Sequence, residues 1–413
     1  MRDGIDLRKL RYLPDSMTMP LKRDGLDPLP DLARLRAEAP VTRLTELFGK
    51  SIWLVSGYAE ARLVLADNTS YSHDLRQFVA MDGRAGSEQI GGLGMTDPPT
   101  HTVLRRYLTP EFTRQRLARL EPTIRAVVNA RIDAMKDAGP VVDLVDQFAF
   151  PVPFEVICEL LGLPVEDRDE FHRLGVARFD LAQGGVGIFS SAAHSRDFLI
   201  RSVAAQRDQP GDGLIGDLLR EHGDELDDVT LGGLADGVFL GGYETSASML
   251  ALGTCLLAEN PDAMEMVRSD DAAASRVIEE MLRHLTVVQV AFLRFARHDL
   301  EIGGQQIKAG DVVGVSLLGA DRDDRLTPGA DRFDPARPPT RHLAFGHGMH
   351  RCVGAELARM ELLIALRALA HHFPRLQVTV APERLEFRKI AAVYGVESLP
   401  VHLYGGALLD RGA

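Results

Sequence analysis

The chain has 413 residues and a formal net charge of −12, and 45% of its residues are hydrophobic. This length allows a large buried core, and the acidic balance argues against a nucleic-acid-binding protein, which normally has a basic surface. The sequence contains no apolar run long enough to span a membrane and no secretory signal, and its three cysteines are too widely spaced for a disulfide framework. We therefore expect a cytoplasmic protein without membrane or nucleic-acid partners.

The pattern of apolar residues predicts a mainly helical chain with a little strand. The longest predicted helix covers 228–259 and ends before Asn260-Pro261, since the residue before a proline disfavours helix. Strand signals follow in 286–317, where Gly303-Gly304 predicts a tight hairpin. No internal repeat or long linker divides the chain, so we expect one domain over 1–413. The other predicted elements are short helix and strand-like pieces within 1–60, helices over about 105–135, 141–205 (with a loop-like interruption at 183–187), 272–285 and 353–372, an irregular segment over 320–341, and closing strands over 376–404.

The stretch Phe345-Gly346-His347-Gly348-Met349-His350-Arg351-Cys352-Val353-Gly354 carries the strongest chemical signal. Its glycines allow the backbone to lie close to a flat ligand, and the helix that opens after Cys352 favours a thiolate through its free N–H groups. Such a thiolate is a soft, electron-rich ligand that suits haem iron. An inert buried cysteine is the simplest alternative, and it accounts for Cys158 and Cys255 but not for the surroundings of Cys352. A zinc site is a further alternative, although the spacing matches no usual zinc pattern; its ligands would be His342, His347, His350 and Cys352.

This stretch resembles the haem-binding signature of the cytochrome P450 family, F-G-x-G-x-H-x-C-x-G, at every fixed position. The resemblance extends over nearly the whole chain. It implies a cytochrome P450-like fold, mainly α with small β-sheets, and haem b (iron protoporphyrin IX) as the cofactor. It also implies that Cys352 is the iron ligand and that Phe345, His350 and Gly354 contact the haem.

Gly241-Gly242-Tyr243-Glu244-Thr245 lies within the longest predicted helix. Two adjacent mid-helix glycines cost roughly 1 kcal/mol each relative to alanine, and Thr245 can bond back to the carbonyl of Gly241 and bend the helix. The stretch resembles the family's A-G-x-[DE]-T element, with glycine in place of alanine at 241. The resemblance implies that Thr245 hydrogen-bonds the iron-bound oxygen and that Glu244 helps to deliver protons. An exposed glutamate beside a helix-bending threonine is the plainer interpretation.

Glu280 and Arg283 stand three residues apart on one predicted helix, where a solvated pair would contribute about 0.2–0.5 kcal/mol. They resemble the family's E-x-x-R motif, whose role is structural because it locks the irregular segment before the haem loop. Arg332, in Ala330-Asp331-Arg332-Phe333, resembles the third member of that framework.

His101 and Arg105 are potential cations four residues apart, which repel each other unless an anion lies between them. The two propionates of a haem would satisfy such donors. The pair matches the family's H-x-x-x-R propionate contact, Arg294 matches the arginine of R-x-A-x-x-D, and His350 can contribute in the same way. Taken singly, each is more simply a surface residue.

Residues 105–125 form a basic patch, with six arginines against Glu111 and Glu121. A solvated helix face is the common explanation of such runs. Our functional hypothesis is that an acidic ferredoxin docks there, with Arg114 and Arg116 contributing to a salt-sensitive association. Because no flavin or iron–sulfur domain is recognisable, we expect electrons from a separate ferredoxin and ferredoxin reductase.

The resemblance implies a haem–thiolate monooxygenase that inserts one oxygen atom from O₂ into a mid-sized hydrophobic small molecule, as in natural-product tailoring. Two alternatives remain open: oxidative coupling or desaturation by the same haem, and a non-catalytic relative that recruits a partner protein. The expected pocket segments are 71–94, 183–191, Gly241-Gly242, 287–292 and 392–396, with mobile lids at 91–94 and 184–187.

Overall fold

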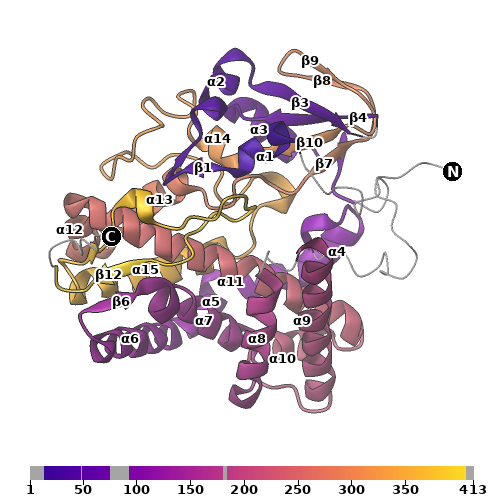
Figure 1. The fold of residues 1–413 in the computed structure, drawn as a ribbon. Helices are drawn as coiled ribbons and strands as arrows, with labels where there is room; N and C mark the ends of the chain where they lie inside the picture. Colours follow the sequence, from indigo (N-terminus) through magenta and orange to yellow (C-terminus); the bar gives the residue numbers. More distant parts are fainter. Residues whose placement is uncertain (1–13, 48, 75–92, 180–183, 406–413) are drawn as a thin grey trace.

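The computed structural model describes residues 14–47, 49–74, 93–179 and 184–405. A small β-rich part, built from the N-terminal region and from residues near 300, lies at one end, and the helices of the middle of the chain lie at the other (Figure 1). The helices are α1 (Asp15–Thr18), α2 (Pro30–Glu38), α3 (Tyr58–Ala66), α4 (Thr100–Leu108), α5 (Arg114–Leu117), α6 (Glu121–Ala138), α7 (Pro151–Leu161), α8 (Arg168–Phe179), α9 (Gly184–Gln206), α10 (Leu214–His222), α11 (Asp228–Glu259), α12 (Pro261–Ser269), α13 (Asp271–Leu285), α14 (Leu317–Asp321) and α15 (Ala355–His372).

The main sheet has the order β3-β4-β10-β7-β5 and joins segments that are distant in sequence. β10 runs parallel to β4, with Val312 opposite Ile52, and antiparallel to β7, so Arg294 is held opposite Val313. A second sheet, in the order β11-β12-β6, closes the helical part. The strands are β1 (Arg23–Asp24), β2 (Asp27–Pro28), β3 (Val41–Leu47), β4 (Lys50–Val55), β5 (Tyr71–Ser72), β6 (Val141–Asp143), β7 (Arg294–Ala296), β8 (Leu300–Ile302), β9 (Gln305–Ile307), β10 (Val312–Val315), β11 (Gln377–Val378) and β12 (Pro400–His402).

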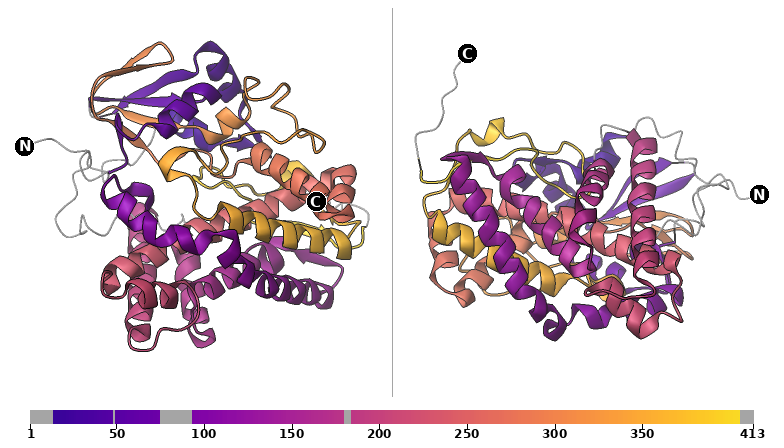
Figure 2. Two further views of the ribbon diagram at one scale, coloured as in Figure 1. Left: turned by 180° about the vertical axis from the view of Figure 1, so that it is seen from behind. Right: turned by 90° about the horizontal axis from the view of Figure 1, so that it is seen from below.

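Helix α11 is the long helix of the core and begins and ends where the sequence predicts. The Asp227 side chain accepts a hydrogen bond from the Thr230 N–H, which caps the N-terminus, and the helix stops at Asn260 before Pro261. Most of its second half is buried, and α7, α9, α13 and α15 pack against the helix along its length. The left view in Figure 2 shows α15, in gold, between the β-rich part and the helices of the middle of the chain.

Several predicted boundaries differ from those observed. The predicted interruption at 183–187 is wrong for Gly184–Gly187, since α9 begins at Gly184, and residue 183 lies outside the described residues. The alternating stretch 286–292 forms isolated bridges, Val288 with Val393 and Val290 with Ser316, rather than one strand. The Gly303-Gly304 hairpin is confirmed, and both residues have a positive φ, as a tight turn between β8 and β9 requires. Within the described ranges, no helix is long and apolar enough to cross a membrane.

Candidate active site

The loop before α15 presents Cys352 from a constrained backbone. The Cys352 N–H donates to the Phe345 carbonyl (2.9 Å), and Gly346 and Gly348 both have a positive φ. A Cβ at position 348 would lie 2.3 Å from the Leu65 carbonyl oxygen, so only glycine allows the loop to pack against α3. The Phe345 ring lies under the Arg359 guanidinium at 4.7 Å. The loop is therefore fixed from both ends.

Cys352 is solvent-accessible but closely surrounded by protein. Burial raises the pKa of its thiol, while the Gly354 N–H and the guanidinium groups of Arg105, Arg351 and Arg359 oppose that rise. The Gly354 N–H thus favours the thiolate, in the direction that the sequence predicts, but burial outweighs it and the net direction of the pKa is upward. Coordination to a metal deprotonates a thiol outright, and the surrounding positive groups then favour the bound anion.

Three imidazoles and one guanidinium converge beside this loop. The His350 ring lies 4.1 Å from the His101 ring of α4 and 3.8 Å from the His73 ring. Both ring nitrogens of His101, Nε2 of His350 and Nε of Arg294 are buried and have no hydrogen-bond partner among the described residues. Burial, together with the charges of His101, Arg294 and Arg105, lowers the pKa of His350 to about 3, and burial alone lowers that of Arg294 to about 10. Burial makes it unfavourable for these groups to carry a positive charge, and several of their nitrogens make no hydrogen bond within the described chain. A bound anion would offset both effects, so the cluster indicates a site for an anionic ligand.

These residues fit the propionate side of a haem, because two carboxylates would satisfy the unused donors. The predicted convergence of His101, Arg294 and His350 is thus present in the geometry. Arg105 lies close enough to His101 and His350 to lower the pKa of both beyond the effect of burial, and its Nη2 also donates to the Arg351 carbonyl (2.6 Å), which ties α4 to the cysteine loop. His73 follows β5 and was not predicted, since no local motif marks it.

Thr245 bonds back to the Gly241 carbonyl at 2.6 Å, as the sequence predicts. Gly241 is exposed although it lies mid-helix, and a Cβ there would meet no atom of the described residues within 4 Å. At Gly242, by contrast, a Cβ would lie 2.8 Å from Cδ1 of Ile157. The helix therefore borders open space at Gly241 and is close-packed on the other side. Glu244 is not an exposed acid, because it is ion-paired with Arg388 from the C-terminal region.

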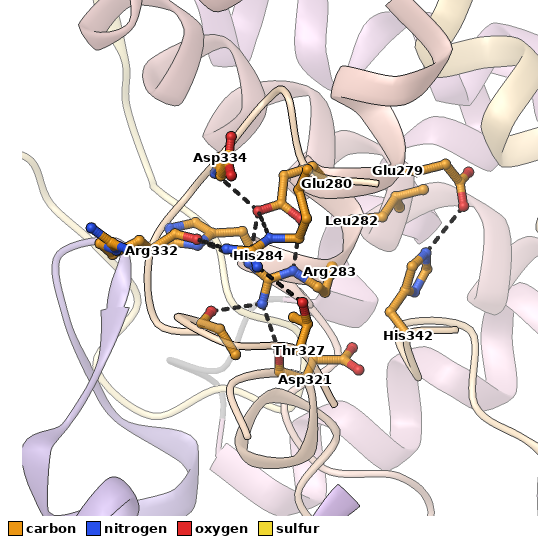
Figure 3. A network of polar contacts seen from close by, with 12 residues as sticks. Glu279, Glu280, Leu282, Arg283, His284, Asp321, Thr327, Arg332, Asp334 and His342 are labelled. Atoms are coloured by element: carbon orange, nitrogen blue, oxygen red, sulfur yellow. Dashed lines mark hydrogen bonds and ion pairs between the residues drawn. The ribbon is translucent and has the colours of Figure 1, made fainter. Parts of the chain in front are cut away.

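Glu280 lies at the centre of a buried polar network, shown in Figure 3. Arg283 donates to both Glu280 oxygens (2.7 and 2.8 Å) and to the carbonyls of Asp321 and Ala330. The exposed fractions of the two side chains are 3% and 0%, so the predicted solvated-pair alternative is wrong. Asp321 in turn accepts from the Leu343 N–H (2.6 Å). The network therefore reaches the start of the cysteine loop.

The third member of this network is Arg337, and the prediction of Arg332 is wrong for the side chain. Arg337 Nε lies 3.2 Å from Glu280 Oε1 and its guanidinium is buried. The Arg332 side chain is exposed, and only its carbonyl takes part, accepting from Arg283 and Arg337. The Asp334 N–H also donates to Glu280, so the irregular segment wraps around the carboxylate.

Glu279, next to Glu280, makes a second connection to the same loop. It lies 3.2 Å from His342 Nε2 and is ion-paired with Arg359 of α15. Burial alone would raise the pKa of Glu279, but these partners overcome it and lower the pKa to about 2. His342 is thus occupied by a carboxylate, and among the described residues no three potential metal ligands converge. The zinc alternative has no support.

Most arginines of the predicted basic patch are neutralised within the protein. They pair with acids that are mostly distant in sequence, and the pairs are Arg114–Glu356, Arg116–Glu221, Arg119–Asp217 and Arg125–Glu121. A separate depression of about 240 Å³ beside the cysteine loop is lined by Arg62, Arg341, Arg351 and Arg359. Of these, only Arg359 is ion-paired with an acid in the described chain.

Comparisons with known proteins agree with this site. The family model for cytochrome P450 matches residues 191–387. Cytochrome P450 165C4 of Amycolatopsis orientalis is 39% identical, over 89% of this chain and 92% of the relative, and the monooxygenase PikC of Streptomyces venezuelae is 37% identical over 93% of each. The structure of P450 StaH, from biosynthesis of glycopeptide antibiotic A47934, matches with a TM-score of 0.84 and 38% identity over 93% of this chain and 99% of that one. The chain belongs to the cytochrome P450 family, and it is a haem b-dependent monooxygenase.

Proposed function

We propose that the protein inserts one oxygen atom from O₂ into a mid-sized hydrophobic small molecule, in the tailoring of a natural product. The observation that carries this proposal is the pairing of Cys352 with buried, unpartnered donors on His101, Arg294 and His350. Cys352 would hold the iron and the three donors the propionates. The haem, when bound, supplies the oxidising chemistry, and the protein supplies the ligand, protons and a dry pocket. Phe345, Gly354 and Arg105 position the loop and helix around it.

Thr245 and Glu244 are the groups we assign to oxygen and proton handling. The Thr245 hydroxyl donates a hydrogen bond to the Gly241 carbonyl, and it can instead accept or donate a hydrogen bond on the open side of α11. Burial raises the pKa of Glu244, although Arg388 opposes the rise, which brings this carboxyl nearer to the range of a useful general acid.

Exposed apolar side chains beside Arg294 support the proposal of an apolar substrate. Phe292 and Leu293 directly precede Arg294 and are 51% and 44% exposed, which is unusual for large hydrophobic residues. Relatives named for reactions on small molecules include 6-deoxyerythronolide B hydroxylase of Saccharopolyspora erythraea (35% identical) and pentalenic acid synthase of Streptomyces avermitilis (35% identical). Within the predicted pocket segment 71–94, residues 75–92 lie outside the described residues.

For electron supply we propose a ferredoxin that docks at the arginine-lined depression rather than at Arg114 and Arg116. Arg62 and Arg341 have no described acidic partner, so an acidic protein can use their charge without breaking an existing ion pair. We expect Arg62→Glu and Arg341→Glu to weaken ferredoxin binding and to reduce its salt dependence. Arg125→Glu, at an arginine already paired with Glu121, is the matched control.

Oxidative coupling is the second candidate, because the structure of OxyC, implicated in an oxidative C–C coupling reaction during vancomycin biosynthesis, matches with a TM-score of 0.83 and 38% identity. Candidate substrates found by their spin-state shift would be turned over under ¹⁸O₂ with a surrogate ferredoxin and reductase. Insertion predicts a product heavier by one ¹⁸O. Loss of two hydrogens without ¹⁸O would identify coupling or desaturation, and a chain that binds no haem would favour a recruitment module.

A further inference from the structure

The Glu244 carboxylate is held by a segment that lies far from it in sequence. Phe387 bridges Val396, and the Arg388 N–H donates to the Gly395 carbonyl (3.0 Å), so residues 387–396 form a hairpin. A Cβ at Gly395 would lie 2.8 Å from Oγ of Ser248 on α11. The hairpin is therefore packed directly on the helix that carries Glu244.

From this hairpin Arg388 reaches two carboxylates. Its Nη1 is hydrogen-bonded to Glu244 Oε1, and its Nε lies 3.4 Å from Glu397 Oε1. The exposed fractions are 13% for Glu244, 12% for Arg388 and 59% for Glu397. Arg388 and the exposed Glu397 thus connect the solvent with Glu244, the acid beside Thr245.

The charges of this chain favour uptake of one proton. One cation between two carboxylates carries a net charge of −1, and protonation of Glu244 leaves a neutral Arg388–Glu397 pair. Among the described residues, the other titratable groups near Glu244 are Tyr243, whose phenol has a pKa raised by burial, and, close to Tyr243 on α7, Cys158, whose pKa burial raises to about 12. Both stay neutral near pH 7, so Glu244 is the group that can accept the proton.

We propose that Arg388 and Glu397 form a proton-entry gate for Glu244 on the hairpin side of α11. In the resting state Arg388 holds Glu244 as a carboxylate. When a proton from solvent binds Glu244, Arg388 stays with Glu397, and the new Glu244 O–H is free to donate toward Thr245. Once the proton has left, the carboxylate returns to Arg388. Arg388 is thus a positioning residue, and the inference rests on the proton role proposed for Glu244.

The test compares the pH dependence of oxygen consumption in Arg388→Gln, Arg388→Lys and Glu397→Gln, with a surrogate ferredoxin and reductase as electron source. Arg388→Gln removes the cation, which should stabilise protonated Glu244 and move the alkaline limb of the pH profile of oxygen consumption to higher pH by about 1–3 units. Glu397→Gln removes an anion and should move the same limb to lower pH. Arg388→Lys keeps the charge and should behave like the wild type. Arg367→Gln, which breaks an ion pair with Asp271 elsewhere, is the matched control and should cause no shift.

A second readout does not depend on turnover. Infrared difference titration of the haem-loaded protein without O₂, with the Glu244 band identified by its loss in Glu244→Gln, should show the same opposite shifts. If the Glu244 titration shifts in the same direction in Arg388→Gln and Glu397→Gln, or in neither, while both variants keep a wild-type haem spectrum, the gate is overturned. Absence of a thiolate-ligated haem in the wild type would instead refute the proposed function. If Arg388→Gln fails to fold, the exposed Glu397→Gln still decides, because an unchanged or upward-shifted pH profile in that variant would overturn the gate.

Discussion

Replacing Glu280 by glutamine should lower the free energy of unfolding by about 3–5 kcal/mol, because it leaves two buried guanidinium groups without their anion. Arg283 is 0% exposed and Arg337 is 7% exposed, so water cannot replace the lost charge. Glutamine keeps the size and one acceptor of Glu280, which confines the loss mainly to the charge. Since the same network holds Asp334 and the segment before the cysteine loop, haem retention should fall in parallel.

The matched control is Glu265→Gln. Glu265 and Arg268 are also three residues apart on a helix and doubly hydrogen-bonded, but they are 61% and 43% exposed. Such a pair contributes at most about 1 kcal/mol. Urea unfolding followed by far-ultraviolet circular dichroism would give both differences. The reasoning fails if Glu280→Gln costs no more than Glu265→Gln.

Three further predictions concern neighbouring positions. Arg337→Leu should destabilise the protein by about 3 kcal/mol or more, whereas Arg332→Ala should stay within about 0.5 kcal/mol; equal effects in urea unfolding would reject Arg337 as the third member. Gly241→Ala should stabilise α11 by up to about 1 kcal/mol, and Gly242→Ala should gain less because it meets a side chain of α7; the reverse order in thermal unfolding would contradict the open space at Gly241. Because the pKa of Glu279 is about 2 when folded, the stability difference between wild type and Glu279→Gln should be complete above pH 4.5 and disappear as the pH falls toward 2; a difference that does not change with pH would refute this.

Local signals in the sequence predicted the elements that are fixed locally. Helix α11 was placed correctly because its helical pattern is long and an Asn-Pro step marks its end, and the Gly303-Gly304 turn because its conformation needs glycine. At 184–187 the same reasoning failed: glycine permits a loop but does not require one, and here packing of α9 against α8 and α11 favours helix.

The site residues that the sequence missed are those chosen by tertiary contacts. Both Arg332 and Arg337 lie in an irregular segment, and only the position of Glu280 decides which side chain turns inward. Arg388 meets Glu244 across 144 residues, and no local motif joins them. The arginines at 114 and 116 formed an apparent basic patch because their partners, Glu356 and Glu221, lie 242 and 105 residues away in sequence.

The bond between iron and Cys352 is tested most directly by the absorption spectrum of the reduced, carbon monoxide-bound protein. We expect a strongly red-shifted Soret band in the wild type, as a thiolate ligand gives, and its loss in Cys352→Ala. The buried Cys255→Ala should keep the band, which controls for the loss of a cysteine as such. A wild-type protein without that band, or a Cys352→Ala variant that retains it, would contradict the assignment.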